Sequence, residues 1–210
     1  MYKILIFGPQ GAGKGTQAER LSRRLGIPAM SMGQLLRDEV AQQTELGKKI
    51  QAIMATGKLA SDEDALQALR ARLQKPDAVD GYIIDGYPRN PIQFDVFKTL
   101  DTPTHAILLE LPDDEVVERL SGRRTCKNCG TVFHMQYRPS KVEGICDACG
   151  GPLVQREDET PDALRQRLGI YRRDTAPLAD AFQAMGVLHR IDGRGTMEEV
   201  EDRIKQAVGA

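Results

Sequence analysis

The sequence predicts an α/β protein built on a mostly parallel, doubly wound sheet with flanking helices. The main observation is that short apolar runs alternate with segments of helical period along the chain. A glycine-rich turn directly follows the first apolar run, as expected where a strand leads into a helix. The 210 residues are enough to bury a full core, and they fit one domain with insertions better than several independent domains.

The elements can be placed along the chain from these patterns. Residues 14–25 put Ala18 and Leu21 on one helix face, and this helix is expected to stop at Gly26. The predicted strands are residues 3–7, 82–85, 106–111 and 187–191, with 29–31 as a further short one. Helix starts are marked by Asn90 before Pro91, by Thr160 before Pro161, and by Thr196, which forms a capping box with Glu199.

Two stretches interrupt this alternation and are predicted to be insertions. Residues 31–60 suit two helices and are called the helical insertion below. Residues 123–160 hold all four cysteines, show little helical period, and are called the flap. The remaining residues, 1–30, 61–122 and 161–210, would form the central domain.

Charge and hydropathy exclude several classes of protein. The 29 Lys plus Arg nearly balance the 30 Asp plus Glu, which excludes a generally basic nucleic-acid binder. Arginines outnumber lysines 19 to 10, which favours bidentate recognition of phosphates or carboxylates. No apolar run is long enough to span a bilayer, so we expect a cytoplasmic protein whose cysteines are reduced.

The first functional motif is Gly8-Pro-Gln-Gly-Ala-Gly-Lys-Gly-Thr16, between the first strand and a helix. Its glycines let successive backbone N–H groups turn toward phosphate oxygens, and Lys14 can reach the β- and γ-phosphates. The strict pattern has Ser or Thr directly after the lysine, whereas this chain has Gly15 and then Thr16. A strand–loop–helix context with this lysine predicts phosphate binding rather than a plain tight turn.

A second motif follows the predicted strand 82–85. Asp85 ends that strand, at the edge where open α/β sheets bind ligands and close to the phosphate loop. Its carboxylate could hold Mg²⁺ through water, and Arg89 could bind a phosphate. Beside a phosphate loop, this reading is favoured over an exposed ion pair at a turn.

The four cysteines form the third motif. Cys126, Cys129, Cys146 and Cys149 have the spacing C-x₂-C-x₁₆-C-x₂-C, which is typical of a structural zinc site. Four thiolates leave no open coordination position, so the metal is expected to be structural. Iron fits the same ligands, and paired disulfides are the alternative without a metal. His134 is not needed as a ligand and is expected on the flap surface.

Together these motifs resemble those of the adenylate kinases, in the same order and over essentially the whole chain. The further stretches that carry the resemblance are Ser31-Met-Gly-Gln-Leu-Leu-Arg37, Gly57-Lys-Leu59, Asp85-Gly-Tyr-Pro-Arg89 with Gln93, Gly122-Arg-Arg124, Arg156-Glu-Asp158 and Arg165-Gln-Arg167.

The resemblance implies a CORE with a five-stranded parallel sheet, a domain that binds nucleoside monophosphate (the helical insertion) and a LID (the flap). It also implies the reaction ATP + AMP ⇌ 2 ADP with Mg²⁺, carried out by a monomer, and many bacterial members have a zinc-bearing LID. Phosphoryl transfer needs in-line positioning and neutralisation of charge, which suits arginines delivered from mobile parts.

Site residues follow from the resemblance position by position. Those expected to contact ATP are Gly11, Ala12, Gly13, Lys14, Gly15, Thr16, Arg119, Arg123, Val132, Phe133 and Gly195. Those expected to contact AMP are Met32, Arg37, Lys58, Leu59, Ala60, Gly86, Tyr87, Pro88, Arg89, Gln93, Arg156 and Arg167. The group in transfer would be met by Lys14, Arg89, Arg123, Arg156 and Arg167, with Asp85 holding the Mg²⁺.

Two residues depart from the family pattern. Met32 stands where threonine is usual, which removes a polar contact near the AMP base. Gln34 replaces the usual aspartate, which removes a carboxylate from the shell around Mg²⁺.

Three alternatives remain open from the sequence. One is a kinase for another base, such as UMP or CMP, although those enzymes have a short LID. Another is GTP as the phosphate donor. The third is a zinc ribbon that binds nucleic acid, which is disfavoured because the flap has only six Lys plus Arg against five Asp plus Glu.

Overall fold

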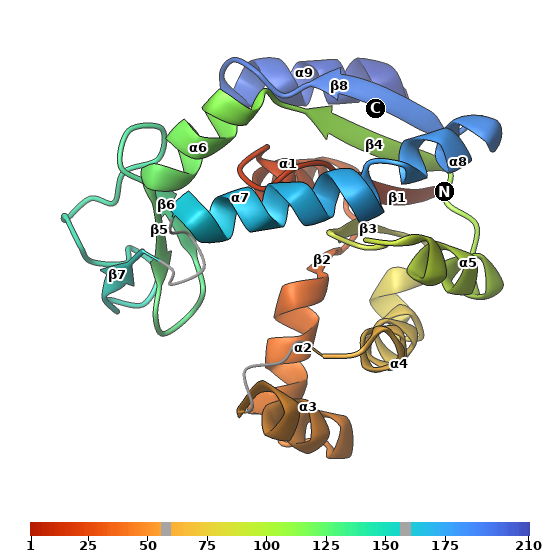
Figure 1. The fold of residues 1–210 in the computed structure, drawn as a ribbon, viewed down its shortest axis with the longest axis horizontal. Coiled ribbons are helices and arrows are strands. Elements are labelled where there is room, and N and C mark those ends of the chain that lie inside the picture. The colour runs from red at the N-terminus through yellow and green to blue at the C-terminus, as the bar shows by residue number, and fades with distance from the viewer. Residues whose placement is uncertain (56–59, 156–160) are drawn as a thin grey trace.

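A computed structural model describes residues 1–55, 60–155 and 161–210 of the chain. A five-stranded sheet with helices on both faces forms its centre (Figure 1). The strand order is β2-β3-β1-β4-β8, and every neighbouring pair is parallel. These strands are β1 (Tyr2–Phe7), β2 (Ala29–Ser31), β3 (Gly81–Asp85), β4 (His105–Glu110) and β8 (Leu188–Asp192).

The sheet confirms the predicted fold class and all five predicted strands, each to within one residue at either end. β1 lies in the middle, and its Ile4, Leu5 and Ile6 are fully buried between the helical layers. Such near-continuous apolar runs are typical of parallel strands covered on both faces.

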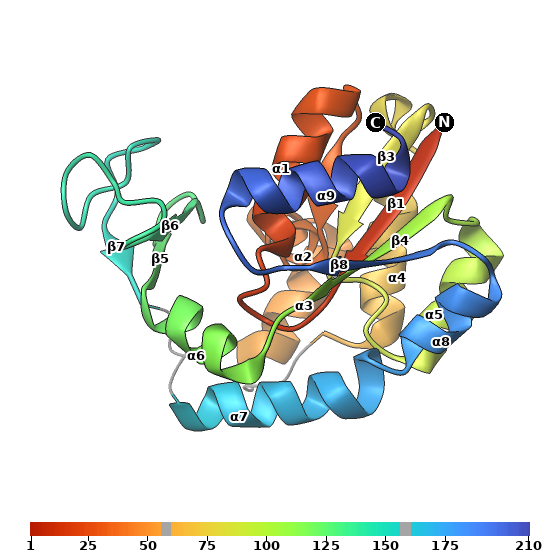
Figure 2. The same cartoon turned by 90° about the horizontal axis from the view of Figure 1, so that it is seen from above.

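Helices from distant parts of the chain cover each face of the sheet (Figure 2). One apolar cluster joins the sheet to α1 (Lys14–Leu25), α6 (Asp113–Ser121), α7 (Pro161–Ile170) and α9 (Met197–Val208). The other joins it to α4 (Asp62–Leu73), α5 (Pro91–Leu100) and α8 (Leu178–Ala184). A 3₁₀ turn (η1, Pro76–Ala78) precedes β3, and a π-helical turn (η3, Tyr171–Thr175) follows α7.

Three of the four predicted helix boundaries lie in the described residues, and all three are confirmed. Gly26 ends α1 in the left-handed conformation, with φ of 67°. Asn90 caps α5 by accepting a hydrogen bond from the Gln93 N–H at 2.8 Å. Thr196 and Glu199 form the capping box of α9. The proposed cap at Thr160 falls outside the described residues.

The helical insertion consists of α2 (Met32–Ala41) and α3 (Glu45–Ala55), as predicted. The two helices pack unusually closely, because a Cβ added to Gly47 would lie only 1.9 Å from the backbone oxygen of Glu39. Buried Leu46 and Ile50 contact Ala68 of α4, and this small cluster joins the insertion to the central domain. The sequence did not predict α4 as a helix.

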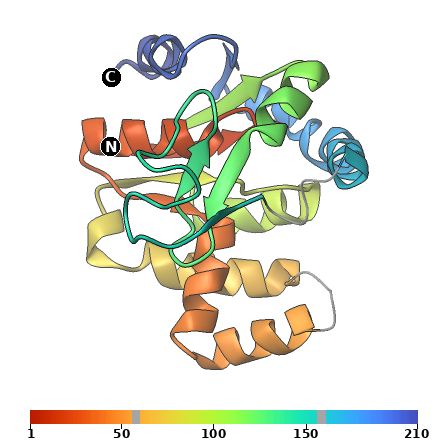
Figure 3. The same ribbon diagram turned by 90° about the vertical axis from the view of Figure 1, so that its left-hand side faces the viewer.

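The flap is an antiparallel sheet beside α6, with the order β6-β5-β7 (Figures 1 and 3). Its strands are β5 (Arg123–Cys126), β6 (Val132–His134) and β7 (Leu153–Val154). Its small core contains Cys126, Phe133, Cys146 and Leu153. In the described part of the chain, none of the helices is long and apolar enough to cross a membrane.

Candidate active site and metal centre

The phosphate loop joins β1 to α1, and its glycines are required by close backbone approach. Gly8 has φ of 145°, and a Cβ there would lie 2.4 Å from the backbone oxygen of Leu109 on the neighbouring strand. Gly13 has φ of 88° and is the N-cap of α1. The loop therefore leads directly into a helix N-terminus, where free N–H groups and the helix dipole favour an anion.

Lys14 begins α1 and turns back into the loop. Its Nζ donates hydrogen bonds to the carbonyl oxygens of Gly8 at 3.0 Å and Pro9 at 2.8 Å. Burial lowers the pKa of Lys14 to about 8, against the attraction of Asp85. The positive charges of Arg89, Arg123 and Arg167 lower this pKa further. These arginines belong to the loop after β3, the flap and α7, so four separate segments bring cations to one place.

Asp85 lies beside the phosphate loop at the end of β3, where it pairs with Ile6 of β1. A Cβ added to Gly15 would lie 3.3 Å from Oδ2 of Asp85, so a larger residue after the lysine would crowd this carboxylate. Burial raises the pKa of the Asp85 carboxyl, while Lys14 and Arg89 lower it. Its buried Oδ1 has no hydrogen-bond partner among the described residues. An orphaned carboxylate oxygen at this position fits a water-bound cation.

The loop after β3 is held in a fixed shape around Arg89. Arg89 Nε donates to the Gly86 carbonyl at 2.7 Å, and the Arg89 N–H donates to Gln93 Oε1 at 2.8 Å. Gln93 Nε2 donates in turn to Asp62 Oδ1 at 2.6 Å, and Thr175 Oγ1 donates to the Arg89 carbonyl at 2.6 Å. Both ends of the Gln93 amide are therefore bonded within the protein, and Oε1 positions the Arg89 backbone. The contact of Gln93 with the AMP base, which the resemblance implies, stays a prediction.

The same loop contains the remaining residues expected at AMP in this part of the chain. Gly86 has φ of 75°, the Tyr87–Pro88 peptide bond is cis, and Tyr87 is almost fully buried. The Tyr87 hydroxyl donates to the Gln93 carbonyl at 3.3 Å.

Arg37 lies on α2 and is oriented by a residue that departs from the family pattern. Gln34 Oε1 accepts hydrogen bonds from Arg37 Nη2 at 2.8 Å and Nε at 3.2 Å. Gln34 Nε2 also donates to Asp38 Oδ1 at 2.7 Å. A Cβ on Gly130 of the flap would lie 3.5 Å from Gln34 Oε1, so the flap reaches the helical insertion here. The other departure, Met32, is buried in the core.

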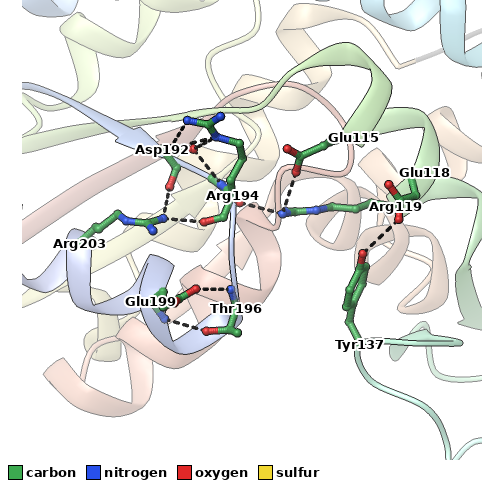
Figure 4. Close-up of polar contacts among 10 residues, drawn as sticks. Glu115, Glu118, Arg119, Tyr137, Asp192, Arg194, Thr196, Glu199 and Arg203 are labelled. Atoms are coloured by element: carbon green, nitrogen blue, oxygen red, sulfur yellow. Dashed lines mark hydrogen bonds and ion pairs between the residues drawn. The ribbon is translucent and has the colours of Figure 1, made fainter.

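Arg119 lies on α6 and contacts the turn between β8 and α9 (Figure 4). Its Nη2 donates to the Gly193 carbonyl at 3.0 Å and lies 3.5 Å from Glu115 Oε2. Arg203 Nη1 donates to the carbonyls of Asp192 at 2.8 Å and Arg194 at 2.6 Å. This turn contains Gly195, so the structure brings two of the residues expected at ATP to one end of the sheet.

The two flap residues expected at ATP differ in their surroundings. Val132 is 44% exposed, whereas Phe133 is 5% exposed and belongs to the core of the flap. Their side chains point to opposite faces because they alternate along β6. Phe133 can therefore meet a nucleotide only through its backbone in this arrangement.

The four cysteines form one cluster in which every pair of Sγ atoms lies within 4.8 Å. The Sγ atoms of Cys126 and Cys149 are 3.4 Å apart, and those of Cys129 and Cys146 are 3.6 Å apart. A disulfide would need about 2.05 Å. Four sulfurs at about 2.3 Å from a tetrahedral zinc would lie about 3.8 Å from each other, so these spacings fit a metal.

The two cysteine turns have matching backbone geometry. Gly130 N–H donates to the Cys126 carbonyl at 3.0 Å, and Gly150 N–H donates to the Cys146 carbonyl at 2.9 Å. Both glycines have positive φ, at 73° and 71°, a conformation that glycine adopts without strain. His134 is outside this cluster, as expected, but it is partly buried against α6 instead of lying on the flap surface.

Some expected site residues lie outside the described part of the chain. These residues are Lys58, Leu59 and Arg156. Sequence reasoning missed Asp62, Thr175 and Gln34 as residues that position the arginines. The contacts of Asp62 and Thr175 join residues from different elements, so nothing in the local sequence indicates them. Gln34 and Arg37 are three residues apart on α2, a spacing that makes them neighbours on the helix surface.

Comparison with known proteins agrees with this arrangement. A sequence profile of the family described as adenylate kinase matches residues 6–187. An adenylate kinase of Streptomyces avermitilis is 44% identical over 98% of this chain and 96% of its own length. Those of Caldicellulosiruptor bescii and Archaeoglobus fulgidus are 43% and 42% identical, over 99% and 96% of this chain and 98% and 95% of their own lengths. The chain therefore belongs to the adenylate kinase family of phosphotransferases.

Proposed function

We propose that this protein catalyses reversible phosphoryl transfer from ATP to AMP, giving two molecules of ADP. The observation that carries the proposal is the convergence of Arg89, Arg123 and Arg167 on Lys14. Four cations near enough for the arginines to lower the pKa of Lys14, beside a glycine-rich loop, are what a polyphosphate site requires. Membership of the adenylate kinase family and the long flap favour AMP as the acceptor over UMP or CMP, whose kinases have a short LID.

The phosphate loop and α6 would hold ATP. Backbone N–H groups of residues 11–16 would bind its phosphates, with Lys14 between the β- and γ-phosphates. Arg119, the turn at Gly195 and the flap residues Val132 and Phe133 would lie around its base. Lys14 Nζ donates to two loop carbonyls, of Gly8 and Pro9. When ATP binds, its phosphate oxygens would replace these carbonyls as acceptors.

AMP would bind between the helical insertion and the loop after β3. Arg37 and Arg89 would hold its phosphate, and Gln93 would contact its base. Both arginines are preorganised, by Gln34 and by the Gly86 carbonyl. Residues 58–60, Arg156 and Arg167 complete the set proposed for this nucleotide.

Asp85 is the residue proposed to hold Mg²⁺, through water. When bound, Mg²⁺ would neutralise charge on the β- and γ-phosphate oxygens. The chain's own residues would position both nucleotides in line and exclude water once the flap and insertion close. A Cβ on Gly130 of the flap would lie 3.5 Å from Gln34 Oε1 of the insertion, and this proximity supports the proposed closure.

The metal of the flap is proposed to be structural zinc. Four thiolates are soft ligands, and a complete tetrahedral set leaves no position for substrate. The flap core is small, so the metal would supply much of its stability. Elemental analysis of the purified protein distinguishes zinc from iron.

The proposal is tested by following ADP formation from ATP and AMP with the purified protein. We expect turnover that depends on Mg²⁺. The substitution Arg123→Met should lower this turnover by about 10³-fold, because it removes a hydrogen-bond donor to the negative charge that develops in the transition state. The circular dichroism spectrum of that variant should match the wild type. Turnover within a few-fold of wild type would contradict the role given to Arg123.

A further inference from the structure

His134 ends β6 at the base of the flap, where it pairs with Arg123 of β5. Its imidazole bridges the flap and α6 through both ring nitrogens. Nδ1 lies 3.1 Å from the backbone N of both Gln136 and Tyr137, so it accepts their hydrogens. Nε2 must then carry the ring proton, and it donates to the Arg119 carbonyl at 3.0 Å.

The ring also fits a space that only glycine leaves open. A Cβ added to Gly122 would lie 2.5 Å from Cε1 of His134, which is closer than atoms can approach. The Met135 N–H donates to the Gly122 carbonyl at 2.9 Å. The Tyr137 hydroxyl lies 3.4 Å from Glu118 Oε1 (Figure 4). Three contacts from residues 134–137 therefore hold the end of α6.

The Arg119 carbonyl belongs to the last turn of α6, where carbonyls lack partners within the helix. His134 supplies such a partner from the flap. The guanidinium of the same residue donates to the Gly193 carbonyl at 3.0 Å, in the turn between β8 and α9. Its backbone is thus fixed by the flap and its side chain by the turn proposed to lie at the ATP base.

We propose that His134 is a positioning residue that makes the last turn of α6 move with the flap, so that Arg119 and the flap close on ATP together. This inference rests on the proposed function, in which ATP occupies the site beside Arg119. Of the contacts proposed for AMP, only Arg156 lies in the flap, whereas the others lie on α2, at residues 58–60, in the loop after β3 and on α7. We therefore expect the effect on KM to be larger for the donor nucleotide than for AMP.

Two substitutions distinguish the contribution of Nδ1 from that of Nε2 of His134. His134→Asn keeps an acceptor at the position of Nδ1 but loses the bond to Arg119, whereas His134→Gln keeps a donor at the position of Nε2. We expect His134→Asn to raise KM for ATP about five-fold and to leave KM for AMP within two-fold. We expect His134→Gln to restore KM for ATP to within two-fold of wild type.

A purely structural role for His134, in shaping the turn 134–138, predicts the reverse order. In that case His134→Asn would behave as wild type, and this result would overturn the proposal. A rise of both KM values together in His134→Asn would also overturn it. Ser121→Ala is the matched control, because it removes only the 2.7 Å bond from the Ser121 hydroxyl to the Glu118 carbonyl in the same turn. The Ser121 carbonyl, which accepts a hydrogen bond from Arg124 of the flap, is kept in this variant.

Hydrogen exchange gives a readout that needs no turnover. Adding ATP alone to the wild type should slow exchange in both β5–β6 and the last turn of α6. In His134→Asn the flap should still slow, while the last turn of α6 should not. Equal slowing in that variant would contradict the coupling. If the proposed function were wrong, adding ATP would leave hydrogen exchange of the wild type unchanged, which is a different result from either outcome above.

Discussion

Replacing Lys14 by methionine should remove activity without lowering stability. The buried ammonium is unfavourable in the folded state, because burial and three arginines lower its pKa from 10.5 to about 8. That shift corresponds to about 3 kcal/mol. The variant loses two hydrogen bonds to loop carbonyls, at about 1 kcal/mol each. The balance favours Lys14→Met by about 1 kcal/mol at pH 7, while turnover should fall by about 10³-fold.

The stability difference between wild type and Lys14→Met depends on pH in a defined direction. Because the folded pKa of Lys14 lies below the unfolded value, the unfolded chain binds more protons between about pH 8 and 10.5. The wild type therefore gains stability relative to Lys14→Met as the pH rises through this window. The cost of the buried ammonium is fully present below pH 8, so the advantage of the variant should be largest there.

Urea unfolding at pH 7 and at pH 10 measures the stability difference between wild type and Lys14→Met and its change with pH. The assay with ATP and AMP measures the loss of turnover. Lys98→Met, an exposed lysine on α5, is the control and should change stability by no more than about 0.5 kcal/mol at either pH. A Lys14→Met variant that is several kcal/mol less stable than wild type at pH 7 would contradict the proposed cost of the buried ammonium. A variant that keeps a tenth of wild-type turnover would contradict the catalytic role of Lys14.

Three further outcomes are expected. Arg89→Ala should raise KM for AMP and lower turnover at least 100-fold, with an unchanged far-ultraviolet spectrum, and steady-state kinetics with each nucleotide varied would show this. Chelation of the metal should melt the flap before the rest of the protein, and a single unchanged calorimetric transition would argue against a structural metal. Gly47→Ala should cost about 2 kcal/mol or more, since its Cβ would lie 1.9 Å from the Glu39 carbonyl, and chemical denaturation with a lowered midpoint would confirm it.

The central fold was predictable because its signals are local and strong. Buried parallel strands are short apolar runs, and β1 with Ile4, Leu5 and Ile6 shows this pattern clearly. The flap strands were not predicted, because β5 is mostly polar and because β6 and β7 are only three and two residues long. The helix α4 was also missed. Its Ala65 and Leu69 face the central core while Ala68 faces the insertion, which blurs a simple apolar stripe.

The candidate site was predictable in its chemistry but not in its supporting contacts. Lys14, Asp85 and the arginines stand in recognisable motifs, and the structure brings four of these cations together. The contacts of Gln34 with Arg37 and of Gln93 with Asp62 depend on side-chain geometry. His134 shows the same limit, because its partner on α6 is fixed only once the flap folds.

The central claim is that the converging cations serve phosphoryl transfer from ATP to AMP. Its most direct test is kcat/KM for AMP, UMP, CMP and GMP, each with ATP and Mg²⁺, on the purified protein. We predict that kcat/KM for AMP exceeds that for every other acceptor by at least ten-fold and that ADP is the sole product with AMP. Higher kcat/KM for UMP or CMP than for AMP would contradict it.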